Sequence, residues 1–446
     1  MNIRKWLFFT QARIRGRKLG RYYERYVREY HAGIPSDTTR KLLIKLLEHC
    51  QKSVPYYREI ITRLGNSFHE DPEDYLKNFP ILTKDMIRKN FNELKSVDLA
   101  RRKWYFNSSG GSTGEPVRFI QDLEFNSQAR AVEYFFSKLI GREPGEPEVD
   151  LWGSPDDILQ VHEKWQIKWA NKLTNTFFIN TFRWTPEKMH EALAILNANP
   201  PKLIVSYVEP IYELARLSER ERLPVTSQRA IITSAGTLHP YIREKIEHTY
   251  QCKVYNRYGS REVGNICCER PGKNGLWVAP WSNFIEIMDD QNNRVQDGIE
   301  GEILVTSLIN YAMPFIRYRI EDCGTLLPVR NDSRRDYGQV LEAVTGRTNG
   351  IFRARNGTLV SPGFFTSMLC DREWIRKYQV IQKSFTHFVF RIVKSDSNYQ
   401  RRELDEIIAN TKLALGNDCE VDFEFVDEIP TSGSGKFQYT ICELQI

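Results

Sequence analysis

The sequence predicts a mixed α/β protein. A large N-terminal domain combines parallel strands, covering helices and a β subdomain, and a small, mobile α+β domain follows. Three observations support this class. Residues 1–100 are mainly helical in pattern, strands and helices alternate from about residue 185, and a β-α-β pattern lies near the C-terminus. A chain of 446 residues is long for one hydrophobic core, so a large and a small domain are expected.

Helical signals dominate the first hundred residues. Apolar side chains recur at helical spacing before Pro55, namely Leu42, Leu43, Leu46 and Leu47. Thr83 is a suitable N-cap for a helix over residues 84–94.

The middle of the chain alternates strands with helices. Thr185 is an N-cap candidate, and Pro186 suits the first position of the helix that follows. Buried strands are expected over 203–205, 230–233 and 253–258, with helices over 211–217 and 240–250. This alternation predicts a largely parallel sheet covered by helices.

Two further patterns complete the chain. Strands over 285–288 and 302–306 flank a polar turn, which predicts a β subdomain. A strand at 389–393, an amphipathic helix at 401–415 and a half-buried strand at 421–425 form a β-α-β module. We expect the joint near Gly346-Arg347, which gives a domain over 1–345 for ATP and substrate and one over 346–446.

Composition excludes some classes of protein. No apolar run approaches the roughly 18 residues of a membrane span, and no cleavage pattern of a secretory signal is present, so a cytoplasmic location is expected. The eight cysteines form no C-x-x-C pair and are expected to be reduced. A zinc ion is left open, although the spacing matches no zinc template; the cysteines in question are Cys252, Cys267, Cys268 and Cys323.

The N-terminus is basic. Residues 1–30 contain nine Lys or Arg against Glu24 and Glu29, interleaved with apolar and aromatic side chains. Such a helix either lies on an anionic membrane surface or docks on the main domain through its aromatics. The second interpretation is favoured, and peripheral membrane contact through residues 1–30 is left open. The sequence contains no nucleic-acid recognition module, so no nucleic-acid partner is expected.

Four segments carry groups suited to a nucleotide. The glycine-rich stretch 108–116 can wrap phosphate oxygens with N–H groups and hydroxyls, unless it is only a flexible surface turn. Glu262 closes Tyr258-Gly259-Ser260-Arg261-Glu262 after a predicted strand and could hold Mg²⁺. Asp322 is suited to ribose hydroxyls, and Lys436 lies on a second glycine-rich tip.

The order of these motifs resembles that of the adenylate-forming superfamily of acyl-CoA synthetases and luciferase-like ligases. From about residue 40 to the end, the chain is similar to the phenylacetate–CoA ligase family and to its CapK-type subgroup, found with polysaccharide biosynthesis. Segments 54–58, 79–84 and 301–319 carry the finer similarity.

The resemblance implies a role for each motif. Residues that would bind ATP are Ser109, Gly110, Gly111, Ser112, Thr113 and Gly114 at the phosphates, Ser234, Ala235, Gly236 and Tyr258 at the adenine, Gly259 and Arg261 beside Tyr258, and Asp322 and Arg347 at the ribose. Glu262 would bind Mg²⁺, and Lys436 would contact the α-phosphate and the attacking carboxylate.

The implied reaction joins a carboxylic acid to ATP, giving acyl-AMP and pyrophosphate, and then transfers the acyl group. CoA is the default acceptor and a sugar derivative is an alternative. The alternative to this reaction is a nucleotide-binding partner in polysaccharide assembly. Two departures from the family pattern, Arg261 for a hydroxyl residue and Asn349 for an acid after the hinge, favour it slightly, whereas the intact Glu262, Asp322 and Lys436 argue against it. The acid pocket is undetermined, with core packing the favoured alternative for its candidates: Phe177, Phe178, Phe182, Trp184, Tyr207 and Tyr212.

Overall fold

The computed structural model describes residues 2–108, 117–152, 171–181, 186–328, 337–347, 352–355, 359–360, 365, 368–369, 372, 374–395, 399–430 and 438–444. The chain divides into two compact units: residues 1–320 with 325–343, and residues 321–324 with 344–446. The domain boundary expected between residues 345 and 346 stays a prediction. No helix in the described ranges is both long and apolar enough to cross a bilayer.

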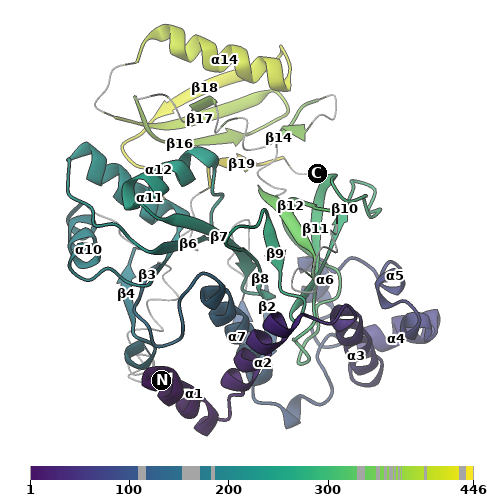
Figure 1. Ribbon diagram of the computed structural model, residues 1–446. Coiled ribbons are helices and arrows are strands. Elements are labelled where there is room, and N and C mark those ends of the chain that lie inside the picture. Colours follow the sequence, from purple (N-terminus) through teal and green to yellow (C-terminus); the bar gives the residue numbers. More distant parts are fainter. Residues whose placement is uncertain are drawn as a thin grey trace. The chain divides into compact units, whose positions relative to one another are not determined.

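Helices occupy much of the first hundred residues (Figure 1). They are α1 (Ile3–Ile14), α2 (Leu19–Ala32), α3 (Thr38–Ser53), α4 (Pro55–Leu64), α5 (Pro72–Leu76) and α6 (Lys84–Lys89), with 3-10 turns η1 (Ser67–His69) and η2 (Leu99–Arg101). As expected, α3 stops before Pro55, and Leu43, Leu46 and Leu47 are buried.

Helix α6 is shorter than the sequence suggests. Thr83 caps it as predicted, because its hydroxyl oxygen accepts from the Met86 N–H at 3.2 Å. The expected extent to Leu94 is wrong. Asn90 is the C-cap: its φ of −109° and ψ of 29° lie outside the α-helical region, and its side-chain amide donates to the Met86 carbonyl at 2.9 Å.

A sheet of eleven strands forms the centre of the fold, in the order β10-β11-β12-β13-β9-β8-β7-β6-β5-β3-β4. The strands are β3 (Glu148–Trp152), β4 (Thr176–Asn180), β5 (Leu203–Tyr207), β6 (Ala230–Ser234), β7 (Lys253–Ser260), β8 (Gly264–Glu269), β9 (Leu276–Val278), β10 (Asn283–Met288), β11 (Glu300–Ser307), β12 (Tyr318–Leu326) and β13 (Val340–Arg347). β3 to β7 pair in parallel, whereas β7 to β9 and β10 with β11 pair antiparallel, so the expected parallel sheet and β subdomain are confirmed.

Helices cover the parallel strands through an apolar core. α10 (Pro186–Ala198), α11 (Val208–Arg220) and α12 (Pro240–Tyr250) pack on β3 and β5 to β7 (Figure 1). α7 (Leu123–Leu139) instead packs against α2 and β8, where Tyr26 stacks on Trp281 with ring centroids 4.6 Å apart. This core holds the parallel strands in place, and the candidate site lies at their carboxyl ends.

The second unit has its own core. Its four-stranded sheet has the order β18-β17-β16-β19, from β16 (Ile375–Gln382), β17 (His387–Lys394), β18 (Glu420–Phe425) and β19 (Thr440–Cys442), beside the pair β14 (Phe352–Arg353) and β15 (Leu359–Val360). Helix α14 (Arg401–Leu415) has the predicted bounds and a capping box formed by Gln400 and Glu403. β17 and β18 are parallel, so the expected β-α-β module is confirmed.

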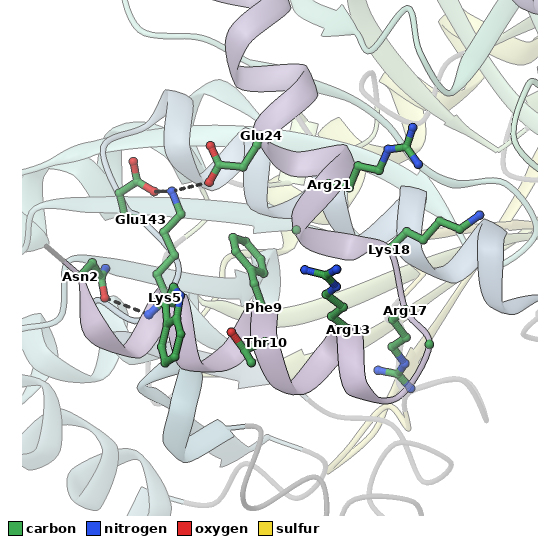
Figure 2. Close-up of a pocket in the computed structure, with 13 residues that line it drawn as sticks. Asn2, Lys5, Phe9, Thr10, Arg13, Arg17, Lys18, Arg21, Glu24 and Glu143 are labelled. Atoms are coloured by element: carbon green, nitrogen blue, oxygen red, sulfur yellow. Dashed lines mark hydrogen bonds and ion pairs between the residues drawn. The ribbon is translucent and has the colours of Figure 1, made fainter.

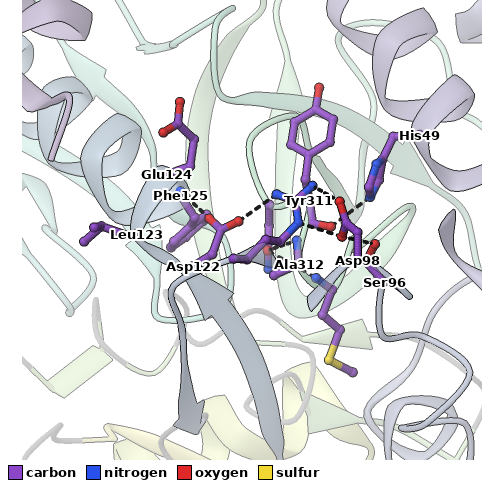
Figure 3. A network of polar contacts seen from close by, with 12 residues as sticks. His49, Ser96, Asp98, Asp122, Leu123, Glu124, Phe125, Tyr311 and Ala312 are labelled. Atoms are coloured by element: carbon purple, nitrogen blue, oxygen red, sulfur yellow. Dashed lines mark hydrogen bonds and ion pairs between the residues drawn. The ribbon is translucent and has the colours of Figure 1, made fainter. Parts of the chain in front are cut away.

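A polar network joins the helical region to the start of α7 (Figure 3). Arg102 donates to both carboxylate oxygens of Asp98 at 2.8 Å and to Asp122 at 2.9 Å. Asp122 also caps α7, accepting from the Phe125 N–H at 2.7 Å. These bonds place β2, on which the site depends, relative to the N-terminal helices.

We expect Asp98→Asn to lower the free energy of unfolding by about 1 kcal/mol at pH 7. Hydrogen bonds from Arg102 hold the pKa of Asp98 at about 2, below its value in the unfolded chain. The stabilisation is therefore complete above the unfolded pKa of roughly 4 and is lost as the pH falls toward 2. Urea unfolding at pH 7 and pH 3.5 should show a smaller difference in unfolding free energy between variant and wild type at pH 3.5.

The control is Asp85→Asn, which removes an exposed carboxylate paired with Arg88. It should change the unfolding free energy by less than about 0.5 kcal/mol at either pH. If the difference in unfolding free energy between Asp98→Asn and wild type were equal at both pH values, the assigned ion pair would be contradicted.

Candidate functional site

One side chain, Gln121, joins the strand that follows the glycine-rich segment to the turn that bears Glu262. Strands β1 (Trp104–Ser108) and β2 (Arg118–Asp122) pair antiparallel, with Ser108 opposite Arg118, and the glycine-rich loop connects them. From β2, the Gln121 amide donates to the carbonyl oxygens of Arg261 at 2.8 Å and Glu262 at 3.3 Å. The base of the loop and the Glu262 turn are thus held together.

Gln121 is itself fixed. Its side chain is buried, and its amide oxygen accepts from Asn107 at 2.9 Å and from the Tyr105 hydroxyl at 3.2 Å. Because both the NH₂ group and the oxygen of this buried amide are hydrogen-bonded, its side chain has little freedom to rotate. Gln121 was not among the predicted site residues; a glutamine directly after the apolar pair Phe119 and Ile120 was the available signal.

The turn after β7 presents Glu262. Gly259 is required there, because a Cβ at this position would lie 2.6 Å from the Gly264 carbonyl oxygen. Glu262 is buried, and the Tyr318 hydroxyl donates to its Oε1 at 3.2 Å. Within the described residues, its Oε2 accepts no hydrogen bond, and the buried Ser260 hydroxyl also has no partner.

This donor set fits a hard cation with phosphate oxygens. Mg²⁺ is usually held by one or two carboxylates, with water and substrate phosphates completing its octahedron. Glu262 has one oxygen oriented by Tyr318 and the other without a protein donor, as such a ligand requires. Tyr318 was not among the predicted site residues, although it opens the segment Tyr318-Arg319-Ile320-Glu321-Asp322 that ends in the predicted Asp322.

A second group of residues lies at the carboxyl ends of the parallel strands. Ser234 ends β6 opposite Tyr207, which ends β5. Ala235 follows with φ +59°, and a Cβ on Gly236 would lie 3.1 Å from Val208. Trp152 ends β3 with its ring centroid 4.0 Å from that of Tyr207. Ligands of α/β sheets bind at this edge, so Trp152 joins the candidate residues.

Backbone strain marks another predicted residue. Asp322 lies on β12, half-buried, directly after Glu321, which has φ +66°. A non-glycine residue in this region costs roughly 1–3 kcal/mol, and such residues cluster at functional sites.

Several predicted residues lie outside the described part of the chain. They are Ser109 to Gly114, Phe182, Trp184, Asn349 and Lys436, together with the side chain of Arg347.

The acid-pocket candidates that the structure describes separate into two kinds. Tyr212, on α11, is partly buried against the core, with its ring centroid 6.0 Å from that of Tyr241, so core packing is confirmed for it. Core packing is wrong for Phe177, which is 52% exposed on the sheet-edge strand β4. Tyr207 is buried yet lies at a strand end beside Trp152, where it can line both core and site.

The cysteines near these motifs are thiols. Cys267 and Cys268 are adjacent and buried on β8, where burial raises the pKa of both, that of Cys268 to about 12. The described residues contain no group of three or more metal-ligating side chains.

Known proteins resemble this chain over most of its length. Protein CapK of Staphylococcus aureus is 24% identical over 95% of this chain and 93% of its own length. The model of the CapK C-terminal domain matches residues 352–443. A phenylacetate-coenzyme A ligase of Aromatoleum evansii is 31% identical over 75% of this chain and 76% of its own length. The chain belongs to the phenylacetate–CoA ligase family of adenylate-forming enzymes, in its CapK-type subgroup.

Solved structures with the same fold include other adenylate-forming ligases. A 2-hydroxyisobutyryl-CoA ligase in its postadenylation state, in complex with an acyl-AMP, aligns with TM-score 0.68 and 16% identity over 91% of this chain and 88% of that one. The same ligase with 2-HIB-AMP and CoA aligns with TM-score 0.59 over 92% and 91% of the two chains. The predicted fold class, a large α/β domain with a small C-terminal domain, is confirmed.

Proposed function

We propose that this family member activates a carboxylic acid with ATP, forming acyl-AMP and pyrophosphate, and then transfers the acyl group to the thiol of CoA. The observation that carries the proposal is the Gln121 link, which joins β2, the strand that follows the glycine-rich segment in the chain, to the turn bearing Glu262. The glycine-rich segment and this turn are the expected ligands of one triphosphate. Relatives named phenylacetate-coenzyme A ligase support CoA as the acceptor.

The residues act by neutralising charge and fixing positions. A carboxylate oxygen attacks the α-phosphorus in line, and pyrophosphate leaves from the opposite side. Two anions meet in this step, so fixed positive charge and alignment supply most of the rate. Mg²⁺ supplies positive charge to the leaving oxygens when bound. Glu262, oriented by the Tyr318 hydroxyl, would hold it, and Lys436 would approach the α-phosphate.

The remaining groups position the nucleotide and the acid. Ser234, Ala235 and Gly236 lie where adenine is expected, at the carboxyl edge of β6. Trp152 and Tyr207 lie along the same edge and give the acid an aromatic wall. We propose a cytoplasmic location for the reaction.

A pyrophosphate-exchange and hydroxylamine-trapping screen across aromatic, fatty and sugar acids tests the proposal. At least one class should give Mg²⁺-dependent exchange and a trapped hydroxamate. Binding of Mg-ATP without turnover of any acid would support instead a nucleotide-binding partner in polysaccharide assembly, as the departure at Arg261 suggests. No affinity for Mg-ATP would reject both functions.

A further inference from the structure

Helix α1 exposes an apolar stripe. It docks on the first unit through Phe8 and Ala12, which are buried. Its outer face leaves large side chains in solvent, with Trp6 58% and Ile14 82% exposed. Four of the twelve large hydrophobic residues exposed in the described part of the chain lie on this one helix: Ile3, Trp6, Leu7 and Ile14. Isolated exposed hydrophobics are ordinary, but a group along one short helix indicates an interaction surface.

The helix is firmly held, so its outer face is a fixed feature. Asn2 caps it, accepting from the Lys5 N–H at 3.0 Å, and donates to the Pro144 carbonyl at 2.8 Å. At the crossing with α2, a Cβ on Gly20 would lie 2.9 Å from the Phe9 ring, so the two helices meet closely. The docking expected through aromatic side chains is therefore confirmed, but it uses only the inner face of α1.

A hollow of about 960 Å³ lies between α1 and α2 and has two electrostatically different ends (Figure 2). At one end, Lys5 pairs with Glu24 at 3.0 Å and with Glu143 at 3.1 Å. At the other end, Arg13, Arg17, Lys18 and Arg21 gather. Lys18 pairs with Glu124, whereas Arg13, Arg17 and Arg21 have no carboxylate within ion-pair distance among the described residues.

Arg17 lies among other cations. Burial, followed by Arg130 and Arg15, lowers its pKa, so neighbouring positive charges disfavour its charged form. The turn beside it approaches Lys103, whose Nζ would lie 3.7 Å from a Cβ on Gly16. An external anion at this end would offset that repulsion.

We propose that α1 and its turn into α2 dock the protein on an anionic lipid bilayer. The apolar stripe would enter the boundary between headgroups and acyl chains, and the arginine end of the hollow would bind lipid phosphates. Stable peripheral binding requires both an apolar and an electrostatic contribution, and this face supplies both. α1 has basic residues and no acidic one. A protein partner fits less well, because the apolar centre of a protein interface is depleted of charge, whereas here arginines border the stripe.

The test is co-flotation of the full-length protein with vesicles of phosphatidylcholine and phosphatidylglycerol at 3:1, against pure phosphatidylcholine, at 0.15 M salt. Wild type should bind the anionic vesicles preferentially and release them at 1 M salt. Trp6→Ser with Leu7→Ser should weaken binding at least tenfold, and so should Arg13→Gln, Arg17→Gln and Arg21→Gln combined. Trp6 and Leu7 are exposed on the outer face of α1, so the Trp6→Ser, Leu7→Ser variant should leave pyrophosphate exchange without vesicles unchanged.

A matched control uses α14, an exposed helix with as many acidic as basic residues. Arg401→Gln, Arg402→Gln and Leu413→Ser remove similar exposed groups there and should leave vesicle binding as in wild type. Absence of binding to anionic vesicles, equal binding to both vesicle types, or equal losses in the α14 control would overturn the proposal. The outcome is independent of whether the protein proves to be a ligase.

Discussion

Replacing Lys436 with alanine is expected to slow acyl-adenylate formation by about 100- to 1000-fold. In the proposed function, this lysine is the fixed positive charge that approaches the α-phosphate while a carboxylate attacks it. Its contribution grows as negative charge develops on the phosphorus oxygens, so the loss should appear in kcat more than in KM. ATP–pyrophosphate exchange with the acid identified by the screen measures this step.

Two comparisons separate a chemical role of Lys436 from a structural one. Lys383→Ala removes a lysine of the same unit that pairs with Glu443 on the surface, and exchange should stay within about twofold of wild type because exposed pairs contribute little. Synthetic acyl-AMP supplied to Lys436→Ala should still yield the thioester, since adenylation is then bypassed. Normal pyrophosphate exchange by Lys436→Ala would refute the assignment.

Local patterns predicted much of the fold. The bounds of α12 and α14 follow from their apolar spacing and from the Pro240 and Gln400 ends. The parallel order of β3 to β7 follows from strands that alternate with helices. These features depend on side chains a few residues apart, which a sequence shows directly.

The links within the site could not be predicted in this way. Gln121 bonds to residues 140 and 141 positions away, and Tyr318 reaches Glu262 across 56 positions. Such contacts depend on which strands become neighbours and on how each side chain is oriented after packing. No periodicity in one sequence encodes them.

Arg317 is another residue whose role could not be read from the sequence. The sequence places it in a basic and aromatic segment that leads to Asp322, and its neighbours give no sign of whether its side chain is buried. In the fold it is buried, pairing with Glu286 at 3.2 Å and donating to the Phe79 carbonyl at 2.8 Å. Its role is structural, because a buried charge must be neutralised by partners inside the protein.

Glu262→Gln is expected to lower Mg²⁺-dependent adenylation by about 100-fold and to raise the Mg²⁺ concentration needed for half-maximal rate. The substitution preserves size and the acceptor for the Tyr318 hydroxyl, but it removes the negative charge that holds the cation. Tyr318→Phe should have a smaller effect of about fivefold, since it removes one neutral donor and leaves the charge in place. Pyrophosphate exchange titrated with Mg²⁺ measures both.

The thermal stability of Glu262→Gln and the response of its rate to excess Mg²⁺ together distinguish metal binding from packing. If Glu262 were only a buried structural acid, Glu262→Gln would lower thermal stability and reduce the rate equally at every Mg²⁺ concentration. If it holds the cation, thermal stability stays near that of wild type and excess Mg²⁺ restores part of the rate. Glu244→Gln, at an exposed position on α12, is the matched control and should leave the Mg²⁺ titration unchanged. A Glu262→Gln variant whose titration matches that control would remove Glu262 from the site, and the link through Gln121 would then serve only the fold.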